Sequence, residues 1–373
     1  MKGSIIPGES RWLHDPATGT RVLQVTSHSS INHPSYFLHR SFLPGDDRLL
    51  FTSYRTGAPQ LFLASFSDGD IVQLTNGPAI HPFSAVLHPS GDMIVFARSG
   101  SFHRLCWATL DETEIIEVAG AQFGEPSLSP DGEWLTAAYR IDNERGLITG
   151  RIDGTEWHRI PFPRTVIHPQ FHPLEPEWIE FAADPAPRMH RVRRDGAGVE
   201  CLYDHGNDEF VVHETFLGQT GRLVFTVWPY RICTMDWTTR AIRPIAEFNA
   251  WHIAPNRAGT QILCDTNHPD RGIHIIDAGS GAPRLVCLSK SSSRGSQWKT
   301  SRYALAEDFS AARSAAETKL SWMEADNDTV YGPQWSHPHP SWSNNEKMVA
   351  FASDRTGSAQ VYMAEVPFTP EQG

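Results

Sequence analysis

The stretch TSYRTGAPQLFLASF at residues 52–66 returns near the other end of the chain as SDRTGSAQVYMAEV at residues 353–366. In both copies an Arg-Thr-Gly turn precedes a short apolar segment of the kind that forms β-strands. Self-similarity between distant parts of a chain indicates a repeat architecture. The two copies therefore predict that one supersecondary unit occurs at both ends of the sequence.

The same unit also occurs between these ends. Turns at residues 89–92 (PSGD), 130–132 (PDG) and 345–346 (NE) each precede an apolar segment, namely MIVFA, EWLTAAY and KMVAFAS. A further strand, DIVQLT at residues 70–75, follows the QLFLASF segment. Short strands with a turn about every ten residues, in units of about 40, are typical of a β-propeller with four-stranded blades. We therefore predict an all-β propeller.

One position recurs at the same phase of each unit, four residues before the turn that opens it. Its occupants are spaced 45, 41, 43, 45, 39 and 87 residues apart and are His39, Ser84, Glu125, His168, His213, His252 and His339. The spacing predicts seven blades with an insertion after the sixth. Five of the seven occupants are histidine, although histidine supplies only 18 of 373 residues. We expect this position on the innermost strand, where the histidines converge at one mouth of the channel. Histidines that only cap backbone groups there are the alternative.

The two ends of the chain are expected to share the last blade. The segment from about residue 339 to 366 supplies three strands, and RVLQVT at residues 21–26 resembles the closing strand DIVQLT. We predict that residues 21–26 complete blade seven and leave no open sheet edge. Residues 289–332 break the repeat and are rich in helix formers. They are expected to form a helical or loop insertion on the channel face of one domain that spans residues 1–373.

Composition excludes several classes of partner and place. A net charge of −11 disfavours nucleic acid. No apolar run approaches the roughly 18–20 residues that cross a membrane, and the N-terminus lacks a secretory signal. The five cysteines are scattered without Cys-x-x-Cys spacing, which indicates a reducing compartment, the cytoplasm.

A candidate metal site lies in the segment Gln334-Trp335-Ser336-His337-Pro338-His339-Pro340. In an extended segment His337 and His339 point to the same side, so both imidazoles can chelate one divalent cation. The Gln334 amide oxygen can join them if the chain curves. A plain proline-rich turn is the alternative interpretation.

With these histidines and seven blades, the chain resembles oligogalacturonate lyases, which are metal-dependent polysaccharide lyases. The most specific element is Gln334, His337 and His339 followed by Pro-Ser-Trp at residues 340–342. The resemblance implies that these three side chains and His252, in its His-x-x-x-Asn context, bind a manganese-type cation. The interval between His252 and Gln334, 82 residues, is longer than expected for the family because of the insertion.

The resemblance also implies catalytic roles. His213, in the strand Val-His-Glu-Thr-Phe at residues 212–216, matches the proposed base, and Arg188, in an Arg-Met pair 25 residues earlier, matches a catalytic arginine. His33 with the Tyr-Phe pair at residues 36–37 resembles the family's first blade. The candidate substrate-binding residues are Tyr36, His39, Arg40 and His168.

The implied reaction is β-elimination from a 4-linked galacturonide, di- or oligosaccharide. His213 would remove the C5 proton, while the cation and Arg188 stabilise the carboxylate and the developing enediolate. Neutral nitrogen and oxygen ligands leave the cation its full charge and suit Mn²⁺ better than a closed zinc site. A lyase for another uronate-containing oligosaccharide is one alternative. A non-catalytic TolB-like propeller that serves as a binding scaffold is another.

Overall fold

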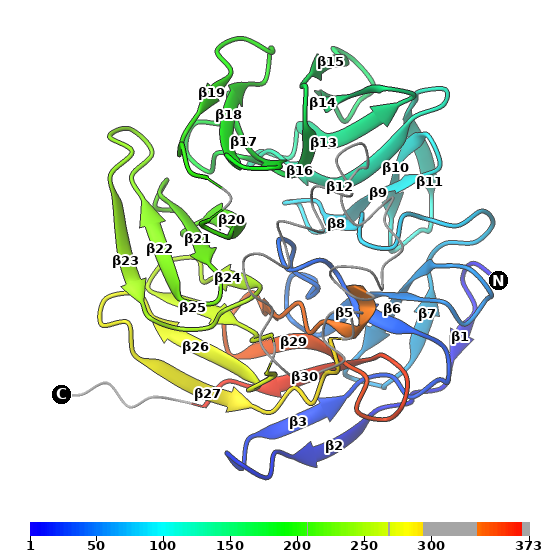
Figure 1. Ribbon diagram of the computed structural model, residues 1–373. Coiled ribbons are helices and arrows are strands. Elements are labelled where there is room, and N and C mark those ends of the chain that lie inside the picture. Colours follow the sequence, from blue (N-terminus) through cyan, green and yellow to red (C-terminus); the bar gives the residue numbers. More distant parts are fainter. Residues whose placement is uncertain (207, 268, 294–333, 368–373) are drawn as a thin grey trace.

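The computed structural model describes residues 1–206, 208–267, 269–293 and 334–367, and in this part of the chain the strands form seven sheets. Figure 1 shows the sheets arranged around a common axis as the blades of a propeller. The predicted seven-bladed all-β fold is confirmed. Most of the predicted insertion, residues 294–332, lies outside the described residues. Among the described helices, none is long and apolar enough to cross a membrane.

The strands of the first four blades follow, each blade read from the axis outward. Blade one contains β4 (Asn32–Pro34), β5 (Arg48–Ser53), β6 (Gln60–Ser65), β7 (Ile71–Gln73) and β1 (Ile5–Ile6). Blade two contains β8 (Val86–Leu87), β9 (Met93–Arg98), β10 (Ser101–Cys106) and β11 (Glu112–Glu117). Blade three contains β12 (Gln122–Leu128), β13 (Trp134–Ile141), β14 (Glu144–Arg151) and β15 (His158–Pro161). Blade four contains β16 (Thr165–Phe171), β17 (Trp178–Asp184), β18 (Met189–Arg193) and β19 (Glu200–Cys201).

The other three blades continue around the ring. Blade five contains β20 (Val211–Phe216), β21 (Leu223–Val227), β22 (Arg231–Met235) and β23 (Ile242–Ala246). Blade six contains β24 (Ile253–Pro255), β25 (Gln261–Cys264), β26 (Ile273–Asp277) and β27 (Pro283–Cys287). Blade seven contains β28 (Ser341–Trp342), β29 (Met348–Ser353), β30 (Gln360–Glu365), β3 (Arg21–Gln24) and β2 (Arg11–His14). The short 3₁₀ helix η2 (Gln334–Ser336) precedes β28.

Blade seven is closed by the start of the chain, as predicted. Strand β3 pairs antiparallel with β30, with Leu23 opposite Met363. The same side-chain network marks both closures: Thr75 donates a hydrogen bond to Gln60 at 2.7 Å in blade one, and Thr26 donates one to Gln360 at 2.8 Å in blade seven. The segment 21–26 therefore pairs with the third strand of blade seven in the same way as 70–75 pairs with the third strand of blade one. Strands β1 and β2, which extend blades one and seven at their outer edges, were not predicted.

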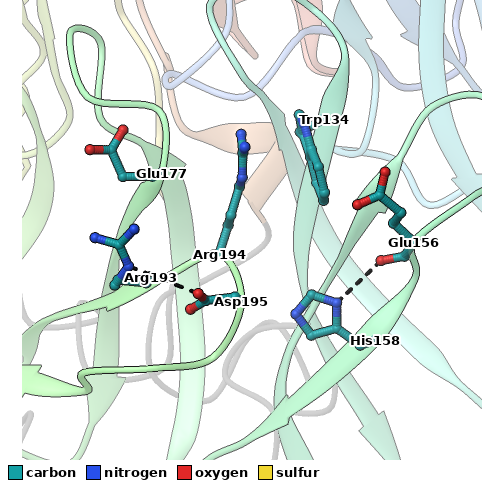
Figure 2. A pocket seen from close by; sticks show the side chains of 7 residues that line it. All are labelled: Trp134, Glu156, His158, Glu177, Arg193, Arg194 and Asp195. Carbon is teal, nitrogen blue, oxygen red and sulfur yellow. Dashed lines mark hydrogen bonds and ion pairs between the residues drawn. The ribbon is translucent and has the colours of Figure 1, made fainter.

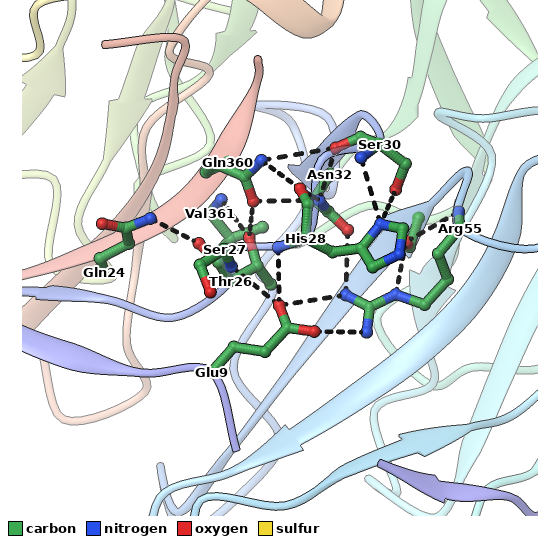
Figure 3. A network of polar contacts seen from close by, with 11 residues as sticks. Glu9, Gln24, Thr26, Ser27, His28, Ser30, Asn32, Arg55, Gln360 and Val361 are labelled. Atoms are coloured by element: carbon green, nitrogen blue, oxygen red, sulfur yellow. Dashed lines mark hydrogen bonds and ion pairs between the residues drawn. The ribbon is translucent and has the colours of Figure 1, made fainter. Parts of the chain in front are cut away.

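A polar clasp holds the closing segment to both blades (Figure 3). Glu9 accepts hydrogen bonds from the backbone amides of Ser27 and His28, at 2.8 and 3.0 Å. The guanidinium of Arg55 lies 2.8 Å from the Glu9 carboxylate, with side-chain exposures of 5% and 14%. Arg55 also reaches the Asn32 side chain at 3.2 Å. Because Arg55 follows β5 of blade one and residues 27–28 follow β3 of blade seven, this clasp joins the first and last blades.

The hydrophobic core lies between neighbouring blades. Phe51 and Phe62 of blade one, for example, are buried against Val361 and Met363 of blade seven. Each sheet thus buries both faces, and removal of this apolar surface from water is the main favourable contribution to folding. The rigid ring holds the inner strands at fixed positions around the axis.

Candidate metal centre and active site

Backbone conformation directs the histidines of the recurring position. Glu125, His168 and His213 lie within inner strands, whereas Ser84, His252 and His339 stand just before theirs. His168, His213 and His339 have positive φ values of 55°, 56° and 45°. The pairing of β16 and of β20 also shifts register at this point. Bulges of this kind re-aim a side chain, and a left-handed non-glycine residue costs on the order of 1 kcal/mol or more. The strained backbone at these three positions sets the direction of the imidazole side chains.

Three of the predicted metal ligands come together. One ring nitrogen each from His252, His337 and His339 lies within 4.8 Å of the others, and all three residues are buried. Two nitrogens bound to one cation at about 2.1 Å are at most about 4.2 Å apart, so a small rotation of the rings suffices. Gln334 begins η2, but its side chain lies outside the described part of the chain.

The chemistry of these donors fits a cation. Neither ring nitrogen of His339 has a hydrogen-bond partner among the described residues, although both are buried. A buried polar atom without a partner is costly. Burial lowers the pKa of His339 and of His252 well below 6.5, and the neighbouring histidines lower both further. Both imidazoles are therefore neutral near pH 7 and can offer lone pairs to a metal.

Asp265 and Trp251, which were not predicted from the sequence, form hydrogen bonds with the candidate ligands His252 and His337. The Asp265 carboxylate lies 2.7 Å from His252 Nδ1 and is fully buried. Burial raises the pKa of Asp265 to about 7, against the effect of hydrogen bonds and of His337. Trp251 Nε1 donates a hydrogen bond to His337 Nδ1 at 3.3 Å. No motif identified these residues, because Asp265 meets His252 only through the pairing of two strands.

His213, the predicted base, lies beside the three ligands. Its ring centroid is 4.5 Å from that of His252 and 4.5 Å from the nearest ring of Trp251. Its Nδ1 has no hydrogen-bond partner among the described residues. Burial lowers the pKa of His213 well below 6.5, and His252 and His168 lower it further. A neutral imidazole with an available nitrogen can accept a proton.

Arg188 is buried in a carboxylate cluster next to this base. Its Nε and Nη2 bind the two oxygens of Glu214 at 2.7 and 3.2 Å, and its Nη1 binds Asp184. Burial alone would raise the pKa of Glu214, but Arg188 and His168 bring it well below its ordinary value. Burial and the Glu214 charge raise the pKa of neighbouring Glu180 well above its usual range. The guanidinium thus already balances buried anionic charge.

Two of the four candidate substrate-binding residues join the cluster. The Tyr36 hydroxyl lies 2.9 Å from His168 Nε2, and His168 Nδ1 lies 3.6 Å from the Glu214 carboxylate. Phe37, the residue after Tyr36, packs its ring 5.2 Å from His213 and 5.1 Å from His252. This aromatic pair comes from the loop after β4 of blade one.

The other two candidates point elsewhere. Burial lowers the pKa of His39 to about 4, opposed by a hydrogen bond with the backbone of Pro126 in blade three. Arg40 reaches Asn344, at 3.5 Å, in the turn after β28. His339 precedes β28, so Arg40 and the candidate metal ligands lie at opposite ends of that strand.

A separate pocket of about 430 Å³ lies between blades three and four. Figure 2 shows its lining, which combines three carboxylates with two guanidinium groups, a histidine and a tryptophan: Trp134, Glu156, His158, Glu177, Arg193, Arg194 and Asp195. Arg194 lies 4.3 Å from the centroid of the Trp134 ring. Since β15, which carries His158, is the outermost strand of its blade, this pocket is distinct from the histidine cluster at the axis.

Comparison with known proteins agrees with the sequence motifs. No protein-family model matches the chain. The oligogalacturonate lyase of Dickeya dadantii (strain 3937) is 22% identical over 98% of this chain and 98% of that protein.

Two solved structures share the fold. The crystal structure of oligogalacturonate lyase from Vibrio parahaemolyticus matches with a TM-score of 0.81 at 20% identity, over 98% of this chain and 99% of that chain. An oligogalacturonate lyase in complex with manganese also matches with a TM-score of 0.81 at 20% identity, over 98% of both chains. The chain is therefore similar along nearly its whole length to oligogalacturonate lyases and has their fold.

Proposed function

We propose that this protein is an oligogalacturonate lyase, which cleaves 4-linked galacturonide di- and oligosaccharides by β-elimination with a divalent cation, Mn²⁺. The observation that carries the proposal is the position of His213, whose ring lies 4.5 Å from that of His252 in a cluster of three potential ligands. The similarity to oligogalacturonate lyases, one of them in complex with manganese, supports it.

His252, His337 and His339 would hold the cation, with Gln334 as a fourth ligand. When bound, a divalent cation supplies positive charge that offsets the negative charge developing on the C6 carboxylate of the substrate. As ligands the three imidazoles would be neutral and would not diminish that charge. Carboxylate ligands would do so.

His213 would act as the general base. Its neutral imidazole takes the proton from C5, a C4–C5 double bond forms, and the C4–O4 bond breaks with departure of the sugar oxygen. Phe37 and Trp251 both pack edge-on against the ring, with centroids 5.2 and 4.5 Å away. These contacts restrict the ring, so the nitrogen that accepts the proton is held in one place.

Arg188 would stabilise the same developing charge. A guanidinium has five N–H donors, and Glu214 engages two of them while Asp184 engages one. A substrate carboxylate would therefore share this guanidinium with two protein carboxylates. We propose that Arg188 contributes charge to the site and keeps Glu214 ionised beneath His168.

Tyr36 and His168 are proposed to contact the sugar, since their polar atoms belong to the same cluster as His213. His39 and Arg40 remain predictions from the sequence. The expected partner is an acidic oligosaccharide rather than nucleic acid or a membrane. We also propose a cytoplasmic location, because all five cysteines are free thiols and three are buried.

The test is incubation of the purified protein and Mn²⁺ with short oligogalacturonides, followed by absorbance at 235 nm and product mass. The proposal predicts unsaturated products, which disappear with a chelator and return with added Mn²⁺. Oligomers of other uronates, assayed in parallel, distinguish the alternative lyase. A protein that carries the metal but releases no unsaturated product from any uronate would act only as a binding scaffold.

A further inference from the structure

A buried carboxylate outside the ligand set contacts two of the ligand residues. Asp265 directly follows β25 and is fully buried. One of its oxygens accepts the backbone N–H of His252 at 2.7 Å, and the other lies 2.7 Å from His252 Nδ1. Asp265 also accepts a hydrogen bond from the backbone of His339. One side chain thus connects blade six with residues 337–339 (His-Pro-His, the HPH segment), which precede β28 of blade seven.

Strand pairing fixes this geometry. Strands β24 and β25 pair with Ile253 opposite Cys264, so the adjoining residues His252 and Asp265 also meet. Their main chains interact as well, because the Asp265 amide donates to the His252 carbonyl at 3.3 Å. Among the described residues, the ion pair with His252 is the only one that Asp265 makes. Its ion-pair partner is thus a ligand candidate, and His337, a second ligand candidate, also interacts with its charge.

We propose that Asp265 is a positioning residue, which fixes the tautomer and orientation of His252 for metal binding and ties that ligand to the HPH segment. This inference rests on the metal centre of the proposed function and not on the lyase reaction. In this arrangement both oxygens of Asp265 act as acceptors, one for the backbone N–H of His252 and the other for its Nδ1, so Nδ1 carries the hydrogen. The lone pair is then on Nε2, the nitrogen available to a cation, and the carboxylate raises its basicity.

The experiment compares two substitutions that each replace a buried carboxylate by an amide of equal size. Asp265→Asn places an amide group against His252 Nδ1. Asp46→Asn is the matched control, because Asp46 is also buried and also joins two blades, through the backbone amides of Asn344 and Asn345 at 2.7 and 2.9 Å. Asp46 contacts no histidine in the described part of the chain. Far-UV and near-UV circular dichroism verify the fold of both variants.

Mn²⁺ affinity is measured by calorimetry without substrate. Asp265→Asn should bind Mn²⁺ about 10- to 100-fold more weakly than the wild type, as is typical when such a partner is removed. Asp46→Asn should bind within twofold. An Asp265→Asn protein of unchanged affinity, or a wild type that binds no Mn²⁺, overturns the inference. A wild type that binds Mn²⁺ but releases no unsaturated product refutes the lyase while leaving this test valid.

A second readout needs no variant and no metal. Long-range ¹H–¹⁵N spectra of the metal-free wild type, with labelled histidine, report which ring nitrogen of His252 carries the hydrogen. The inference predicts hydrogen on Nδ1. Hydrogen on Nε2 would contradict it, even if Asp265→Asn failed to fold.

Discussion

The imidazole rings of His213 and His252 lie with their centroids 4.5 Å apart and their planes inclined at 62°. The two residues occupy the same phase of neighbouring blades, yet their surroundings differ. His252 Nδ1 is bound to Asp265, whereas His213 Nδ1 has no hydrogen-bond partner among the described residues. The first environment suits a fixed metal ligand, and the second suits a base that must accept and release a proton.

Removal of a ligand should release the metal. His337→Ala and His339→Ala, singly or together, are expected to abolish metal binding and activity while the fold is retained, because blade packing holds the ring. The measurement is elemental analysis after dialysis. His158→Ala, in the outer pocket, is the control and should keep the metal. Stoichiometric metal in the double variant would show that the ligands lie elsewhere.

The clasp between Glu9 and Arg55 should contribute strongly to stability. Glu9→Ala leaves a guanidinium that is only 5% exposed without its carboxylate. Loss of one partner of a buried pair costs about 3–5 kcal/mol. Glu365→Ala is the control, since it removes the exposed Arg21–Glu365 pair of blade seven and should cost less than about 1 kcal/mol. Denaturant unfolding measures both, and equal midpoints would argue against the clasp.

Stability should fall on mild acidification, in part through His39. Its pKa is lowered to about 4 in the folded chain from 6.5. Above pH 6.5 the group is neutral in both states. Between pH 6.5 and 4 the unfolded chain takes up a proton that the folded chain does not, which removes about 3 kcal/mol of stability as pH falls.

The check on His39 is unfolding free energy at several pH values. His39→Gln should lose less stability than the wild type between pH 6.5 and 4. His14→Gln, at an exposed position in β2, should follow the wild type. Parallel curves for all three proteins would exclude His39 as a contributor.

Even the conservative substitution Arg188→Lys should impair the enzyme. Arg188→Ala leaves the buried Glu214 carboxylate without its guanidinium partner and is expected to destabilise the fold by about 3–5 kcal/mol. Arg188→Lys keeps the charge but not the planar fork that binds both Glu214 oxygens. Because the charge is kept, the variant should fold. Because the planar fork is lost, it should lose both substrate affinity and turnover. If Arg188→Lys had the same steady-state kinetics as the wild type, Arg188 would have no role in the reaction.

The strands and site residues that could be predicted from the sequence are mainly those that belong to the repeat. The likeness of residues 21–26 to 70–75 predicted the closing strand. Both segments carry a Gln and a Thr two residues apart, and Gln24 and Gln73 donate hydrogen bonds to the carbonyls of Thr26 and Thr75 at 2.9 and 2.8 Å. Strands β1 and β2 are fifth strands of blades one and seven, which the other five described blades lack, so periodicity could not reveal them. The histidines at the same phase of each unit were predicted to converge, and His168, His213, His252 and His339 do lie together.

The remaining features of the site depend on tertiary contacts. Asp265 reaches His252 through the register of a hairpin, and no spacing rule links them. His39 and Arg40 lie in the loop of residues 35–41, between the end of β4 at Pro34 and the bridge that pairs Phe42 with Leu49. This loop places them away from the inner strand of blade one. The same loop brings Phe37 into contact with the histidines. The sequence shows an aromatic residue at this position but does not reveal that contact.

The most direct measurement combines metal content and turnover in His213→Ala. The variant should keep wild-type Mn²⁺ stoichiometry, because His213 is not a ligand. Formation of unsaturated product at 235 nm should fall on the order of 10²–10⁴-fold, as is typical when a general base is removed. Near-normal turnover on oligogalacturonides, with the metal retained, would contradict the assignment of His213 as the base beside the metal centre.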